Sequence, residues 1–133
     1  MIELRFPAPE TRIPGLNDNE HWRVEHARKL LWQQASFYAA KQQKIRCLER
    51  CTVTVSLPFK TNRRRDPHNF TLAMKWMIDG LVHAEVWPDD TPEYVVTNEP
   101  VCVVGAAEVV ISLAPMPQAQ RDALNVVPGR SSP

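Results

Sequence analysis

Hydrophobic and polar residues alternate along several stretches of the chain, a pattern that predicts β-strands. The clearest runs from Cys51 to Leu57, where the alternation is strict and the centre is β-branched, and Pro58 is expected to end it. A shorter alternating stretch, Ile2 to Phe6, predicts a first strand. Near the other end, residues 94–97 with 101–104, and then 107–113, are expected to form further strands, separated by Gly105 and arranged as a long bent hairpin.

Two longer segments have the composition and period of helices. Residues 20–45 contain no Gly or Pro and are rich in Ala, Gln and Leu, so we expect a helix capped by Asn19, with an exposed first turn. Its expected partly apolar stripe consists of Leu30, Leu31, Gln34, Phe37, Tyr38 and Lys41, and the expected exposed turn of His21, Trp22, Arg23, His26 and Arg28. Residues 69–85 are apolar almost all round, which predicts a helix buried on more than one side.

The element order β-α-β-α-β-β predicts a single α+β domain with a mixed sheet over residues 1–114. Residues 115–133 are rich in Pro and are expected to form a flexible tail, with a short helical piece around 118–125.

Charge and cysteine content exclude several classes of protein. The net charge is +1, but residues 41–65 hold eight basic side chains and one acidic, and residues 76–108 hold seven acidic and none basic. Apolar runs fall short of the roughly 20 residues of a membrane span, and the N-terminus lacks an export signal. Three cysteines without paired spacing support neither a disulfide framework nor a zinc knuckle. The sequence therefore predicts a cytoplasmic protein, with Cys51 and Cys102 as small core residues.

A concentration of charged residues between positions 63 and 90 suggests a site. Each of these residues has an ordinary explanation. Asp66 could cap a helix before Pro67, and Lys75 and Asp79 could form a surface ion pair. The arginines could lie in a solvated loop and the last two aspartates in a solvated turn. The set consists of Arg63, Arg64, Arg65, Asp66, Lys75, Asp79, Asp89 and Asp90. The separate explanations do not account for their occurrence within 28 residues. Lys75 and Asp79, on an otherwise largely apolar helix, are expected to lie close to a metal ion, a salt-bridge partner or a substrate phosphate.

These segments resemble the RusA-type Holliday junction resolvases, which are small phage-encoded or prophage-encoded endonucleases. The family pattern is a run of arginines, Asp-x-Asp-Asn, a helix with Lys-x-x-x-Asp, and a Trp-x-Asp-Asp loop. The matching segments here are Arg-Arg-Arg-Asp-Pro-His-Asn at 63–69, Lys75, Asp-Gly-Leu at 79–81 and Val-Trp-Pro-Asp-Asp at 86–90. Weaker agreement extends the resemblance to about residues 1–114.

The resemblance implies a metal-dependent endodeoxyribonuclease that resolves four-way DNA junctions in recombination and repair. Asp66 and Asp90 would bind a catalytic Mg²⁺, or Mn²⁺, with Asp79 and Asp89 in or beside the ligand set. Lys75 would offset charge on the phosphate. Implied DNA contacts come from Lys60, Arg63, Arg64, Arg65 and Asn69. The resemblance also implies a homodimer whose partner is branched DNA, in the cytoplasm of a bacterium or a phage-infected cell. It implies no membrane association and no organic cofactor.

Two departures from the family pattern leave alternatives open. His68 stands where the family has its second Asp, and Lys75 lies three residues further along. His68 could bind a softer ion such as Mn²⁺, act as a general base and so belong to the catalytic residues, or contact DNA. The alternatives to a junction resolvase are a branched-DNA-binding module with weakened or lost cleavage, and a phosphodiesterase that acts on forks or flaps.

Overall fold

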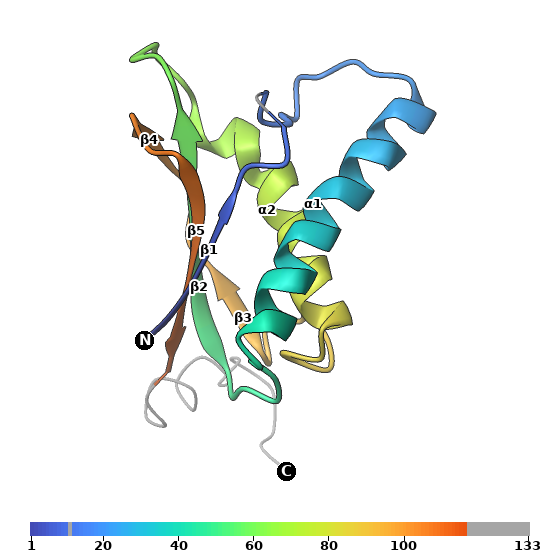
Figure 1. The fold of residues 1–133 in the computed structure, drawn as a ribbon, viewed down its shortest axis with the longest axis vertical. Helices are drawn as coiled ribbons and strands as arrows, with labels where there is room; N and C mark the ends of the chain where they lie inside the picture. Colours follow the sequence, from blue (N-terminus) through green and yellow to red (C-terminus); the bar gives the residue numbers. More distant parts are fainter. Residues whose placement is uncertain (11, 117–133) are drawn as a thin grey trace, which may run out of the picture.

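The computed structural model of the protein describes residues 1–10 and 12–116, which form one mixed sheet and a layer of helices (Figure 1). The strands are β1 (Ile2–Pro7), β2 (Cys51–Phe59), β3 (Val95–Thr97), β4 (Val101–Val104) and β5 (Glu108–Pro115). The helical segments are α1 (Trp22–Gln42), the 3₁₀ turn η1 (Pro67–Phe70) and α2 (Thr71–His83). The predicted α+β class is confirmed.

The sheet is organised around β2. The strand order is β1-β5-β2-β3, and β4 also pairs with β2. β5 is antiparallel to both β1 and β2, whereas β3 and β4 are both parallel to β2. The predicted bent hairpin is wrong, because β3 and β4 lie along one edge of β2 and β5 lies along the other. The chain returns through α2, which makes β3 and β4 run in the direction of β2.

Pro58 does not end the central strand, which continues to Phe59. The N–H of Gly105 donates to the carbonyl of Phe59, so the backbone of Phe59 faces β4 and that of Pro58 faces the opposite edge. Pairing with β5 already ends at Ser56, where it meets Val110. The missing N–H of Pro58 therefore breaks no hydrogen bond of the ladder.

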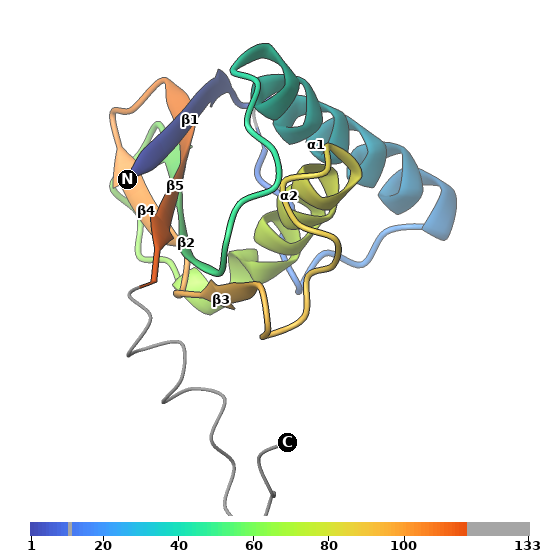
Figure 2. The same ribbon diagram turned by 90° about the horizontal axis from the view of Figure 1, so that it is seen from below.

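Both helices pack on one face of the sheet (Figure 2). The buried strand residues alternate along β2 and β5, as their sequence period predicts: Cys51, Val53, Val55, Leu57, Val109, Ile111 and Leu113. Cys51 is confirmed as a core residue, and Cys102 is half-buried against the core. Burial raises the pKa of both thiols.

No helix within the described residues is long and apolar enough to cross a bilayer.

Helix α1 presents a different face to the core than the sequence suggests. Its buried residues are Arg28, Trp32, Ser36, Ala39 and Ala40. The expected stripe lies mostly outside, where Leu30, Leu31, Gln34, Tyr38 and Lys41 are exposed and Phe37 is half-buried. The predicted Asn19 cap is also wrong, because the ring of His21 accepts from the N–H of Arg23.

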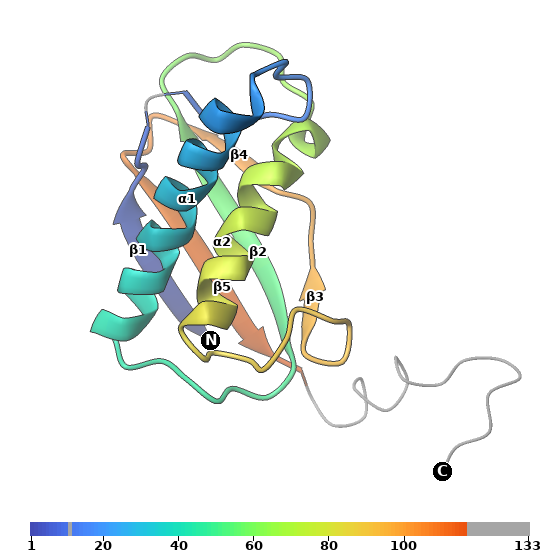
Figure 3. The same ribbon diagram turned by 90° about the vertical axis from the view of Figure 1, so that its right-hand side faces the viewer.

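Small residues explain this orientation, because they let α1 and α2 approach closely (Figure 3). The Ser36 hydroxyl donates to the carbonyl of Met77 at 2.8 Å, and Gly80 lies against Ser36 and the carbonyl of Gln33. Near the start of α2, Leu72 and Trp76 share a pocket with Glu25, and at its end Ala84 shares one with Lys41. The two helices therefore run side by side in the same direction.

The described end of the chain is packed. The N–H of Met116 donates to the carbonyl of Arg50 at 3.0 Å, and the Met116 side chain is buried. Residues 117–133, including the helical piece expected around 118–125, lie outside the described residues.

Gly80→Ala should destabilise the fold strongly. A Cβ at this position would lie 2.1 Å from the Ser36 hydroxyl oxygen and 2.3 Å from the Gln33 carbonyl oxygen, so the helices must separate. We expect the free energy of unfolding, measured by urea denaturation, to fall by about 2 kcal/mol or more.

Gly105→Ala is the matched control, since Gly105 has a positive φ of 83° and open space around it. Backbone strain alone should cost about 1 kcal/mol there. A loss at Gly80 no larger than at Gly105 would contradict the close contact.

Candidate nucleic-acid interface

The basic loop between β2 and η1 is held in shape by Arg65. Its guanidinium donates to the carbonyls of Thr61 (2.7 Å) and Arg63 (3.0 Å), and to the Thr61 hydroxyl at 3.0 Å. It also lies over the ring of Phe59, with 4.1 Å from Cζ to the ring centroid. Arg65 thus fixes the loop, and Arg63 and Arg64 remain exposed at its surface. Lys60, at the start of the loop, is also exposed.

A hollow of about 280 Å³ opens beside this loop. Its wall combines three arginines and a carboxylate with a polar loop: Asn17, Arg63, Arg64, Arg65, Asp66, Asn69 and Phe70. We call it the arginine pocket. Guanidinium groups suit phosphate oxygens, which accept several N–H donors at once, so the arginine pocket has the chemistry of a phosphate site.

Asp66 caps the 3₁₀ turn that leads into α2. Its Oδ1 accepts from the N–H of His68 at 3.1 Å, and Pro67 occupies the first position of the turn. This confirms the helix-cap interpretation of Asp66. The same hydrogen bond fixes the carboxylate at the rim of the arginine pocket, while Oδ2 forms no hydrogen bond within the described residues. His68 is exposed, one residue before Asn69.

Asn69 joins two segments that are far apart in the sequence. Its carbonyl accepts from the N–H of Leu16 (2.7 Å), and its side-chain oxygen accepts from the N–H of Asn17 (3.0 Å). A Cβ at Gly15 would lie 2.5 Å from the Asn69 side-chain nitrogen, so this close approach requires glycine. Asn69, expected from the resemblance to contact DNA, here positions the second wall of the arginine pocket.

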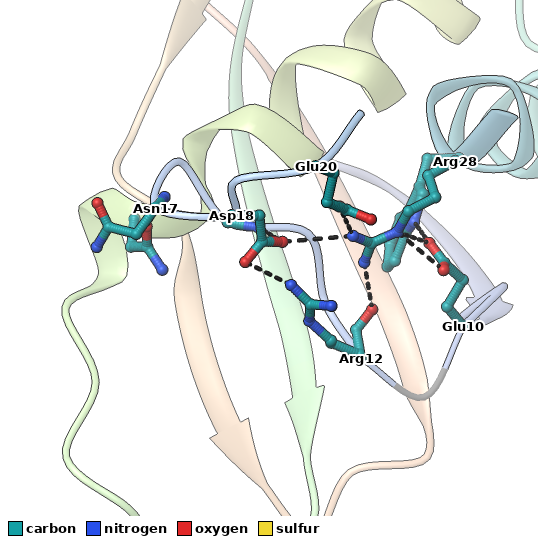
Figure 4. Close-up of polar contacts among 9 residues, drawn as sticks. Glu10, Arg12, Asn17, Asp18, Glu20 and Arg28 are labelled. Carbon is teal, nitrogen blue, oxygen red and sulfur yellow. Dashed lines mark hydrogen bonds and ion pairs between the residues drawn. The ribbon is translucent and has the colours of Figure 1, made fainter. Parts of the chain in front are cut away.

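An ion-pair network around Arg28 holds the loop that carries Asn17, the second wall of the arginine pocket, in place (Figure 4). Arg28 is 7% exposed, and its Nε donates to both oxygens of Glu10 at 3.0 Å. Its Nη1 donates to Glu20 and, at 3.4 Å, to Asp18, and Nη2 donates to the Arg12 carbonyl at 3.2 Å. The sequence predicts an exposed Arg28, and this prediction is wrong, because the network buries it. Sequence reasoning missed the network, although Arg28, Trp32, Ser36 and Ala40 are spaced by four residues along one helix face.

The network also sets the protonation of its members. Burial raises the pKa of the Asp18 carboxyl, but the N–H of Gly15 and the guanidiniums of Arg12 and Arg28 outweigh burial and lower it. Burial lowers the pKa of Arg28, but its hydrogen bonds to Glu10 and Glu20 outweigh that and raise it. Asp18 and Arg28 therefore carry opposite charges near neutral pH.

Three acidic residues, Asp79, Asp89 and Asp90, lie towards the C-terminal end of α2 and in the loop that follows it. The N–H of Asp90 donates to Oδ1 of Asp89 at 2.6 Å, and Asp79 lies on the partly exposed face of α2. Removal of solvent, the hydrogen bond to Asp89 and the charges of Asp79 and Asp89 all raise the pKa of Asp90. The negative charges of Asp79 and Asp89 thus act on the Asp90 carboxyl, and we call these three residues the Asp79–Asp90 group.

The structure does not bring Asp66 and Asp90 together within one chain. Asp66 precedes α2 and Asp90 follows it, and the 13 residues of α2 span about 20 Å. The Phe59 and Phe70 rings, 5.1 Å apart, place the start of the helical segment at one end of β2. At the other end, the indole of Trp87 donates to the carbonyl of Glu49. No three His, Cys, Asp or Glu side chains converge to hold a metal ion in residues 1–10 and 12–116.

Lys75 is exposed one turn into α2 and lies outside ion-pair distance of Asp79. The surface ion pair offered as the ordinary explanation for these two residues is therefore not formed.

Arg28→Met should lower the free energy of unfolding by about 3 kcal/mol at pH 7, since it leaves three partly buried carboxylates without their shared partner. The lowered pKa of Asp18 means that its contribution is present above the ordinary carboxyl pKa and lost as the pH falls through its folded value. The cost of Arg28→Met should therefore shrink towards pH 3. Urea denaturation at several pH values measures it.

Arg5→Met provides the control, because Arg5 pairs with Glu3 on the surface with 58% of its side chain exposed. It should cost less than about 1 kcal/mol at every pH. An equal cost for both variants would contradict the role given to Arg28.

Comparison with known proteins assigns neither a family nor a function to this chain. No protein-family model matches the chain, and no curated protein matches its sequence.

Proposed function

We propose that this protein is a metal-dependent endodeoxyribonuclease that cuts branched DNA, with the four-way junction as its substrate. The observation that carries the proposal is the arginine pocket, in which Arg63 and Arg64 share one hollow with the carboxylate of Asp66. Arginines bind the DNA backbone, and a carboxylate beside a bound phosphate is the group that a hydrolytic metal ion needs.

The donors at this pocket fit a hard divalent cation in kind. Mg²⁺ keeps several waters and is often bound by one or two protein carboxylates together with substrate phosphates. Asp66, with one oxygen held by the His68 N–H and the other without a hydrogen bond, would hold such an ion once DNA occupies the arginine pocket. The ion would polarise the phosphate and lower the pKa of a bound water.

The remaining residues of the pocket bind and orient the substrate. Arg63 and Arg64 contact phosphate oxygens, and Arg65 keeps the loop in position through Thr61 and Phe59. The charge of Lys75, exposed on the first half of α2, would offset negative charge that develops on the phosphate. His68, which is exposed two residues after Asp66, would act as a general base or contact the DNA backbone.

A second candidate is a branched-DNA-binding module that does not cut. It is favoured by the use of Asp66 as a helix cap, a structural role that requires no metal ion. Incubation of the protein with a synthetic four-way junction and Mg²⁺ or Mn²⁺ separates the two candidates. Paired nicks in opposed strands support the nuclease, and binding without nicks with either ion supports the module. Competition with forks and flaps tests the substrate.

Asp66→Asn should abolish cleavage and leave junction binding intact, because the amide keeps the acceptor for the His68 N–H but loses the charge that holds the cation. Gel assays of nicking and of binding measure the two effects separately. If this variant cleaves DNA normally, Asp66 does not bind the catalytic ion and serves only as a helix cap.

Asp90→Asn shows whether the Asp79–Asp90 group takes part. If cleavage survives, the ion is held at Asp66. If cleavage is lost in both variants but returns when they are mixed, the carboxylates of two copies form one site, since a single chain keeps Asp66 and Asp90 apart.

Arg64→Ala should weaken junction binding and reduce the slope of log affinity against log salt by about one. Arg46→Ala is the matched control, because Arg46 is an exposed arginine in a different hollow with Lys41 and Ala84. Equal effects of the two variants in fluorescence anisotropy titrations would show that the arginine pocket is not the DNA contact.

A further inference from the structure

A large hollow, with a volume of about 670 Å³, lies at one end of the sheet beside the basic loop. It is found where β1 and β2 end and β5 begins, at the upper end of the sheet in Figure 1. Much of its lining is apolar: Pro7, Ala8, Pro58, Phe59, Ala106 and Ala107. We call it the strand-end groove. Its volume falls within the roughly 300–1,000 Å³ that is usual for small-molecule sites.

The strand-end groove reaches the buried core and contains aromatic surface. Ile13 and Phe70, which are 6% and 9% exposed, belong to its lining. The ring of Phe59 lies 5.1 Å from the ring of Phe70, measured between centroids. Three alanines in the lining keep the groove open, because their side chains end at Cβ. Apolar and aromatic surfaces of this kind suit a planar ring system.

The charged side chains of the strand-end groove are mostly cationic: Arg12, Lys60, Arg63 and Arg65. The single carboxylate of the lining, Glu10, already accepts hydrogen bonds from Arg28 at 3.0 Å. Lys60, Arg63 and Arg65 form no ion pair within residues 1–10 and 12–116. The chemistry of the groove therefore fits an occupant that combines an apolar body with negative charge.

The strand-end groove adjoins the arginine pocket, because Arg63, Arg65 and Phe70 line both hollows. The guanidinium of Arg65 is fixed between them, since it donates to the Thr61 carbonyl and lies over the ring of Phe59. A phosphate held in the arginine pocket is therefore next to a hollow with apolar walls. A nucleotide has the same order of groups, with a charged phosphate at one end and a flat base at the other.

We propose that the strand-end groove takes up one unstacked base of the DNA strand whose phosphate lies in the arginine pocket. The inference rests on the proposed function for that phosphate, and it adds a site for the neighbouring base. The flat guanidinium of Arg65 and the ring of Phe59 give the base surfaces on which to stack. Stacking of this kind tolerates any of the four bases, since each has a flat face.

Uptake of a base favours branched DNA over an intact duplex. A base leaves a duplex only when its pairing and stacking are broken, and the cost is lowest where the base is already unpaired. Base pairs at a branch point have lost a stacked neighbour, so their bases leave the helix more easily than bases inside a duplex. The strand-end groove thus gives the proposed nuclease a means of selecting its substrate by structure.

Fluorescence anisotropy titrations with two short DNA duplexes test the proposal. Each duplex contains one extra, unpaired nucleotide, which carries a base in the first duplex and is abasic in the second. Wild-type protein should bind the first duplex about tenfold more tightly, as expected for the stacking of one base. Ala107→Leu should remove most of this preference, because the larger side chain occupies part of the groove.

Two further variants serve as controls. Ala27→Leu should keep the preference for the first duplex, since Ala27 is exposed on α1 and does not line the groove. Arg64→Ala should weaken the binding of both duplexes equally, because Arg64 lines the arginine pocket but not the groove. Circular dichroism should show all three variants folded.

Equal affinity of the wild-type protein for the two duplexes would overturn the proposal, as would a preference that Ala107→Leu leaves unchanged. So would a free deoxynucleoside monophosphate that binds as tightly as the first duplex, since the groove would then be a site for free nucleotides. If Arg64→Ala weakens binding but the base makes no difference, this inference alone fails. If the base preference is found but junctions are not nicked, the proposed nuclease activity alone fails.

Discussion

The position of the arginine pocket depends on one buried guanidinium. Arg28 links Glu10, Asp18 and Glu20 to the first half of α1, and the segment that carries these carboxylates also brings Gly15 and Asn17 to Asn69. A buried charge without partners would cost several kcal/mol, so the positions of Glu10 and of residues 12–20 are set by the need to satisfy Arg28. The indole of Trp32, which donates to Glu10 at 2.9 Å, adds a fixed donor to the same carboxylate.

Local patterns in the sequence predict the elements well and their partners less well. The strict alternation of Cys51 to Leu57 identifies the central strand, and the apolar surround of residues 70–82 identifies the buried helix, because both depend on nearest neighbours. The placement of β4 and β5 on opposite edges of β2 depends on the crossover through α2, which no local pattern contains. The sequence does not predict the orientation of α1 for a related reason: the residues that decide it, Ser36 and Gly80, lie on different helices.

The candidate site divides in the same way. The cap formed by Asp66 and Pro67 and the exposure of Arg63 and Arg64 could be predicted, since they follow from short-range geometry. The fixing of Arg65 over Phe59 and the tie between Asn69 and Asn17 could not, because each joins separate segments. The basic and acidic blocks of the sequence likewise do not become a basic and an acidic face. Arg63 lines the arginine pocket, whereas Arg46, from the same block, lies with Lys41 and Ala84.

The contact between Ser36 and Gly80 has a consequence for motion. Two helices in such close contact cannot slide past each other, so α1 and α2 behave as one rigid unit. Asp66 precedes α2 and Asp90 follows it. Movement of a loop cannot shorten this pair of helices. Helix α2 therefore remains a rigid spacer of about 20 Å between the segments that carry Asp66 and Asp90. A single metal ion cannot bind Asp66 and Asp90 of the same chain, so only an extended substrate or a second chain could contact both at once.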